Sequence, residues 1–150
     1  MIHAFLRSIA AIALGLGAGV IAVGLIEAAS VRLYPLPPGI DWEDPLAVQK
    51  ALAAIPLGAL LLVLLAWALG SFVAGWVSAR VAKGAPRAYA TGFGFLFLAF
   101  AIVNLVTIPH PVWFAAVAVV LPLPAAYLGA FLTMRRRPVA AIPSLTDSSD

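Results

Sequence analysis

The sequence predicts an all-α integral membrane protein: a four-transmembrane-helix bundle of two antiparallel helical hairpins. Of the 150 residues, 64% are hydrophobic and only 10% are charged, a balance outside the range of water-soluble domains. The apolar residues gather into four runs, each about as long as a helix needs to cross roughly 30 Å of hydrocarbon. The runs lack the period-two alternation of barrel strands, so helices are the expected way to satisfy the backbone at that depth.

These runs define a transmembrane domain over residues 1–137. The predicted spans cover about residues 9–29, 57–79, 88–108 and 112–134.

The first run has an alternative interpretation as a cleaved signal peptide, with Ala28 and Ser30 before the cut. Its apolar stretch is longer than the roughly 7 to 15 residues of the apolar core of a signal peptide. Glu27 also interrupts the approach to the cleavage site. We therefore expect this span to remain in the protein.

The longest connection, residues 30–50, follows the first span and contains a proline-rich stretch that favours extended or turning backbone. Asp44 is a suitable helix N-cap, and Pro45 suits the first helical position. A short helical segment is therefore expected over residues 45–55, with Pro56 bending it into the second span.

The basic residues predict the orientation, because cytoplasmic loops carry the excess of Lys and Arg. Arg32 and Lys50 are expected on one side of the membrane, and residues 138–150 read as a disordered tail on the other. That other side carries the remaining basic residues, Arg7, Arg80, Lys83, Arg87, Arg135, Arg136 and Arg137. Both termini are thus predicted to be cytoplasmic, in a bacterial inner membrane, and the net charge of +3 indicates orientation rather than nucleic-acid binding.

Two prolines, Pro122 and Pro124, fall near the middle of the fourth span. Each removes a backbone donor and crowds the carbonyl four residues earlier. We expect a kink or local unwinding there. Packing alone could accommodate it, or the break could line a cavity as it does in some transporters.

Small residues recur at spacings that suit helix packing in a bilayer. In the first span, Gly15 and Gly19 fall on one face, whereas Gly17 and Gly24 fall near the opposite face. The predicted packing positions are Gly15, Gly17, Gly19, Gly24, Gly70, Ala74, Ala125 and Gly129. The second face of the first span could contact the same bundle, a second protomer or another membrane protein.

Four polar residues are predicted at nearly the same depth and form our candidate site: Glu27, Asn104, Thr107 and His110. Glu27 is the one acidic residue within an apolar span and is a functional candidate; the structural alternative is an interfacial carboxylate that reaches headgroup water or pairs with Arg32. Asn104 is expected to hydrogen-bond to another helix, and Thr107 to its own preceding turn. His110 could titrate, bind a metal or a partner, or cap a helix.

No catalytic, phosphate-binding or metal-binding motif and no cysteine occurs in the sequence, so we expect no enzyme, cofactor or metal site. Two functions remain open. The first is a non-catalytic interaction or accessory subunit, or a homo-oligomer, whose partners are membrane lipids and either itself or another membrane protein. The second is a small-solute or ion transporter or channel subunit that uses Glu27 and the Pro122/Pro124 break. The shallow position of Glu27 favours the first, because a carrier usually needs polar groups near the midplane.

Overall fold

The computed structural model describes residues 2–35, 38–41, 43–82 and 85–135, and these ranges form helices and their connections. Four helical stretches are long and apolar enough to cross a membrane, which indicates a multi-pass membrane protein. They are α1 (Ile2–Leu33), α3 (Leu57–Ala82), α4 (Pro86–Thr107) and the stretch Val112–Met134. The prediction of four apolar helices is thereby confirmed, whereas the predicted tail at 138–150 lies outside the described residues.

α1 is longer than predicted. It has 32 residues and therefore a length of about 48 Å, against roughly 30 Å of hydrocarbon. Its flanks are rich in good helix formers, so the helix continues past the apolar run. Arg7 consequently lies inside α1 and not before it. Arg7 and Arg32 are separated by about 38 Å along the axis, a distance that lets each reach a different headgroup region.

α2 (Pro45–Ala53) begins where the sequence predicts. The Asp44 carboxylate accepts a hydrogen bond from the Leu46 backbone N–H at 2.9 Å, as an N-cap residue does. The helix ends two residues earlier than predicted, because a residue that precedes proline is disfavoured in helical conformation. Residues 54–56 therefore separate α2 from α3, and Pro56 does not bend one continuous helix.

α4 illustrates how prolines set helix boundaries. Pro86 occupies its first position, where a missing donor costs nothing. At the other end, Ile108 is extended, with φ −122° and ψ 126°, the conformation favoured before a proline such as Pro109. The fourth apolar stretch then starts at Val112 as α5 (Val112–Val120), followed by α6 (Pro122–Arg135).

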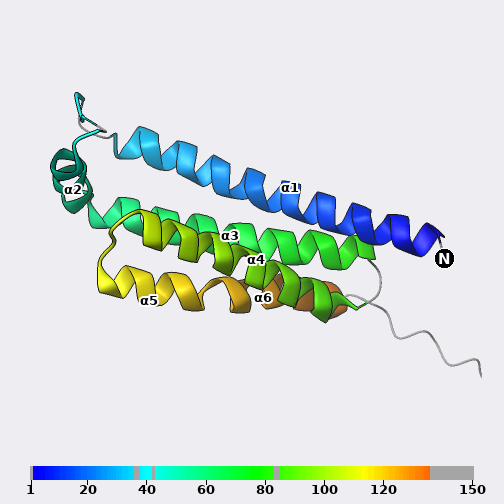
Figure 1. Ribbon diagram of the computed structural model, residues 1–150. Coiled ribbons are helices and arrows are strands. Elements are labelled where there is room, and N and C mark those ends of the chain that lie inside the picture. Colours follow the sequence, from blue (N-terminus) through cyan, green and yellow to red (C-terminus); the bar gives the residue numbers. More distant parts are fainter. Residues whose placement is uncertain (1, 36–37, 42, 83–84, 136–150) are drawn as a thin grey trace, which may run out of the picture.

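α3 is the centre of the bundle. It contacts α1, α4, α5 and α6, with α1 along one side and α5 and α6 along another (Figure 1). α2 stands at one end of the bundle, and the N-terminus of α1 lies at the opposite end (Figure 1). We call these the α2 end and the terminal end.

Small side chains form much of the interior. Among the described residues, seven alanines have no exposed surface: Ala11, Ala66, Ala74, Ala90, Ala118, Ala126 and Ala130. Because α3 is apolar on every side, hydrophobicity cannot select the face that packs, and the closeness of backbone approach decides instead. A Cβ on Gly75 would collide with the backbone of Ala126, and one on Gly129 with the backbone of Phe72. α3 and α6 therefore pack backbone against backbone.

Candidate functional site

A cavity of about 380 Å³ at the α2 end collects most of the predicted polar site. Its walls come from α1, α2, α3, α4 and the connections between them. Glu27, Asn104 and His110 all line this cavity. Three of the four residues that the sequence places at one depth thus surround one space, although they come from α1, α4 and the α4–α5 turn. We call this space the α2-end cavity.

Thr107, the fourth candidate, does not line the α2-end cavity. Its side chain is exposed, and its hydroxyl donates to the carbonyl oxygen of Val103 at 2.7 Å. The hydroxyl is therefore satisfied on its own helix, as the sequence predicts. Thr107 lies outside the site.

The side chain of Asn104 has a buried oxygen, Oδ1, without a hydrogen-bond partner among the described residues, which the sequence did not predict. The predicted bond from Asn104 to another helix was therefore wrong for the described part of the chain. An unpartnered buried acceptor costs about 1–3 kcal/mol. Asn104 lines both the α2-end cavity and a smaller hollow of about 200 Å³, and its Oδ1 is a polar atom that a ligand could satisfy.

His110 is held in one plane and one tautomer. Its Nδ1 atom lies 2.7 Å from the carbonyl oxygen of Ile108, and its ring stacks on Phe114 with centroids 4.5 Å apart. A carbonyl oxygen only accepts, so Nδ1 carries the hydrogen and Nε2 of the neutral imidazole is left as an acceptor. Because Phe114 is fully buried, the stacked imidazole has a fixed support.

Glu27 is exposed at the edge of the α2-end cavity. No ion pair joins it to Arg32 or to any other residue that the structure describes. Among the described residues that line the cavity, it is the one with a formal charge. The carboxylate is therefore the formal charge that this lining offers to a ligand.

The sequence analysis missed three further polar or aromatic residues of the cavity, Ser30, Tyr34 and Trp67. Tyr34 lies over Gly58, where a Cβ would collide with the tyrosine hydroxyl. Trp67 packs edge-on against Phe114 at 5.8 Å between centroids. Helical spacing could have revealed Ser30 and Tyr34, because residues 27, 30 and 34 follow one face of a helix.

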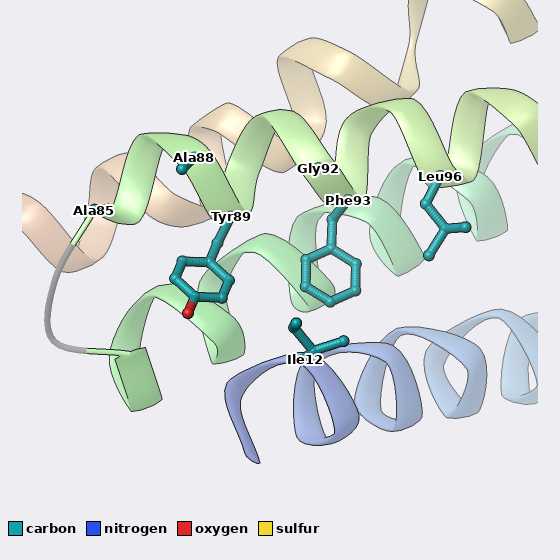
Figure 2. A pocket seen from close by; sticks show the side chains of 7 residues that line it. All are labelled: Ile12, Ala85, Ala88, Tyr89, Gly92, Phe93 and Leu96. Atoms are coloured by element: carbon teal, nitrogen blue, oxygen red, sulfur yellow. The ribbon is translucent and has the colours of Figure 1, made fainter. Parts of the chain in front are cut away.

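A second hollow is an apolar groove of about 560 Å³ between α1 and α4 at the terminal end. Figure 2 shows Ile12 of α1 facing Phe93 of α4, with the ring of Tyr89 beside them. Gly92 also lines the groove, and a Cβ there would meet nothing within 4 Å. Apart from the Tyr89 hydroxyl, the lining side chains are apolar. The groove therefore has little to orient a polar ligand, and the α2-end cavity is the better candidate site.

The two prolines of the fourth apolar stretch lie away from the α2-end cavity. α5 ends at Val120 and α6 begins at Pro122, and Leu121 between them keeps helical angles of φ −66° and ψ −41°. The Leu121 N–H still donates to the Val117 oxygen at 3.0 Å, so the chain bends there without unwinding. Pro122 is fully buried, Pro124 is exposed, and neither lines the cavity.

The predicted packing positions divide into two groups. Gly15 and Gly19 are buried where α1 meets α3, and a Cβ on Gly19 would lie 2.9 Å from the Gly70 carbonyl oxygen and 3.0 Å from the Ala74 Cβ. Gly129 is buried against α3 in the same way. Ala125 is half-buried, and its neighbour Ala126 instead occupies the closest contact with α3.

Gly17 and Gly24 form the second group. Both are exposed, and a Cβ on either would meet nothing within 4 Å. They lie on the side of α1 turned away from Gly15 and Gly19. We call this surface the free face of α1.

The α2-end cavity, at about 380 Å³, lies within the size range of small-molecule sites. No group of three or more His, Cys, Asp or Glu residues that could hold a metal ion occurs within the described ranges. In the part of the chain described, no serine or threonine hydroxyl forms a hydrogen bond with Glu27 or His110. Comparison with family models, with curated proteins and with solved structures finds no match to this chain.

Proposed function

We propose that this chain acts without catalysis, as an interaction or accessory subunit or a homo-oligomer of the bacterial inner membrane. Its contact surface is the free face of α1. The proposal includes two antiparallel hairpins with both termini in the cytoplasm, as the basic residues favour.

The observation that carries the proposal is the pair of unpacked glycines on α1, Gly17 and Gly24. A glycine inside a helix lowers the stability of the helix by about 0.5–1 kcal/mol relative to alanine. Contact with lipid chains does not offset this loss. Packing against another helix can offset the loss, because glycine allows two backbones to approach closely. α1 is also the least covered span: 17% of its most apolar window is buried, against 28–39% in the other three.

Disulfide cross-linking in native membranes tests the contact, and the absence of cysteine from the chain makes the background clean. Gly17→Cys and Gly24→Cys should form oxidation-dependent dimers. Phe95→Cys and Val103→Cys, at exposed positions of α4, are the matched controls. Dimers through α1 alone support a homo-oligomer. A photo-cross-link from residue 17 or 24 to one different membrane protein supports an accessory subunit. Equal reaction at α1 and α4, or none at α1 by either method, contradicts the proposal.

A second candidate, a small-solute or ion transporter, is supported by the location of Glu27 at a cavity. Pro122 and Pro124 do not line that cavity, which argues against a transport site that uses Glu27 and the Pro122/Pro124 break together. If the chain is a transporter, purified protein in liposomes should show solute flux that falls on Glu27→Gln while the helical circular dichroism is unchanged. Flux that is absent, or indifferent to this substitution, excludes the candidate.

A further inference from the structure

We propose that the α2-end cavity binds an organic ammonium: a protonated amine with N–H donors, attached to an apolar body. This inference does not rest on the contact surface proposed for α1. The two proposals use different faces of the molecule and different residues.

The charge of the cavity favours a cation. Glu27 carries the one formal charge among the described residues that line it. Arg32 and Lys50 are close in sequence to lining residues, yet neither lines the cavity, and no described residue forms an ion pair with Glu27. An unpaired carboxylate beside partly apolar walls attracts a cation more strongly than it would in water.

The hydrogen-bonding groups favour a donor. Asn104 Oδ1 is a buried acceptor without a partner. On the His110 ring, Nε2 is the nitrogen that can accept, because the Nδ1 hydrogen points to the Ile108 carbonyl. With the Glu27 carboxylate, three elements of the fold supply three acceptors. A primary ammonium offers three N–H donors, and a quaternary ammonium offers none.

The remaining walls favour an apolar body next to the charge. Leu60, Val63 and Ile108 supply aliphatic surface, and Tyr34 and Trp67 supply aromatic rings. Aromatic faces attract ammonium groups, and tryptophan does so most strongly. The volume of about 380 Å³ lies within the range of small-molecule sites. A hydrated inorganic cation would leave these walls without a partner.

Two sources can supply this chemistry in a membrane. One is the ethanolamine headgroup of a phospholipid, and the other is a free amphiphilic amine. The choline headgroup has the charge without the N–H donors, so it serves as the matched comparison for the first source.

The first experiment compares three probes of equal chain length: octylamine, octyltrimethylammonium and octanol. Binding is followed by Trp67 fluorescence in the full chain carrying Trp42→Phe, Trp76→Phe and Trp113→Phe, in phosphatidylcholine nanodiscs. A variant that keeps Trp76 alone, in place of Trp67, reports non-specific partition. Octylamine should bind at least roughly tenfold more tightly than octanol, since charge-assisted hydrogen bonds form with octylamine alone. Octyltrimethylammonium should lie between them.

Substitutions in the Trp67 protein assign the site. Glu27→Gln and Asn104→Leu should each weaken octylamine binding by about tenfold and leave octanol partition unchanged. Thr107→Val is the matched control, because Thr107 has similar depth but does not line the cavity. Octylamine binding that equals octanol binding, or that survives Glu27→Gln and Asn104→Leu as well as Thr107→Val, overturns the proposal.

A third arm identifies the source. The octylamine titration is repeated in nanodiscs in which phosphatidylethanolamine replaces half of the phosphatidylcholine. A weaker apparent octylamine affinity shows that the lipid headgroup competes for the cavity. An unchanged affinity, with the tenfold preference over octanol retained, identifies a free amine as the ligand. Failure of the α1 cross-links would leave all three arms untouched.

Discussion

At the residue scale, Asn104 and Tyr127 show two outcomes for polar groups in an apolar bundle. Tyr127 of α6 lies 2.5 Å from the Thr91 hydroxyl of α4, and Thr91 also donates to the Arg87 carbonyl oxygen at 2.9 Å. Since a threonine hydroxyl has one hydrogen, Tyr127 is the donor in this pair. Asn104 has no such partner. One polar residue therefore connects two helices, while the other remains available to a ligand.

We predict that Asn104→Leu leaves the ligand-free protein as stable as wild type or more stable, by up to about 1 kcal/mol. The substitution removes an unsatisfied acceptor and keeps a similar volume. The measurement is the free energy of unfolding in mixed detergent micelles, with Thr107→Val as the control. A loss of more than about 1 kcal/mol would show that Asn104 makes a structural bond after all.

We predict that Tyr127→Phe costs about 0.6–1 kcal/mol of unfolding free energy, the usual worth of a hydrogen bond between membrane helices. Thr91→Val should cost a similar amount. The double variant tests the assignment, because two residues that serve one bond should show losses well short of additive. Fully additive losses would mean that the two hydroxyls act independently.

Only part of the candidate site could be predicted from the sequence. The depth of Glu27, Asn104 and His110 could be predicted, because depth follows from each residue's distance along its own helix. Their meeting around one cavity could not, since it depends on how α1 and α4 are placed about α3. The wall residues Tyr34 and Trp67 were missed for the same reason.

At the element scale, α3 and α6 pack backbone against backbone. Gly75 and Gly129 make this contact possible, because neither position has room for a methyl group. Hydrophobic patterning gives no sign of this contact, as both helices are apolar on most of their surface. Of the predicted pair Ala125 and Gly129, only Gly129 lies in this contact, and Gly75 and Ala126 were not predicted.

We predict that Gly129→Ala destabilises the protein by about 1–3 kcal/mol, since the added methyl collides with the Phe72 backbone and forces the helices apart. Gly92→Ala is the matched control, because a Cβ there meets nothing within 4 Å. It should be neutral or stabilising by about 0.5–1 kcal/mol through helix propensity. Unfolding free energies in detergent decide the matter, and equal effects of the two substitutions would refute the close packing.

At the scale of the whole molecule, Arg7, Arg80 and Arg87 lie at the terminal end of the bundle, whereas Asp41, Glu43 and Asp44 lie at the α2 end (Figure 1). Arg80 lies near the end of α3, and its guanidinium stacks over Trp76 at 4.4 Å from the ring centroid. Arg7 and Arg87 lie near the first turns of α1 and α4, whereas Asp41, Glu43 and Asp44 lie close to α2. This separation is the basis for proposing that the terminal end faces the cytoplasm.

We predict that an impermeant maleimide labels Asp41→Cys in intact cells whose outer membrane has been permeabilised. Ala85→Cys, at an exposed position of the terminal end, should react only after the inner membrane is opened. The reverse pattern would invert the orientation. Labelling of both sites in intact cells would contradict a connection on each side of the membrane.

The sequence by itself determined the number of apolar spans and the shared depth of their polar residues. Both depend on hydrophobic length, which each helix carries independently of its neighbours. The tertiary structure alone decided which faces meet, that α1 keeps Gly17 and Gly24 uncovered, and that Glu27, Asn104 and His110 share a cavity. The physical reason is that lipid is as apolar as the helices themselves. Hydrophobicity therefore cannot choose between helix faces, and the choice falls to steric fit, which exists only once all the helices are in place.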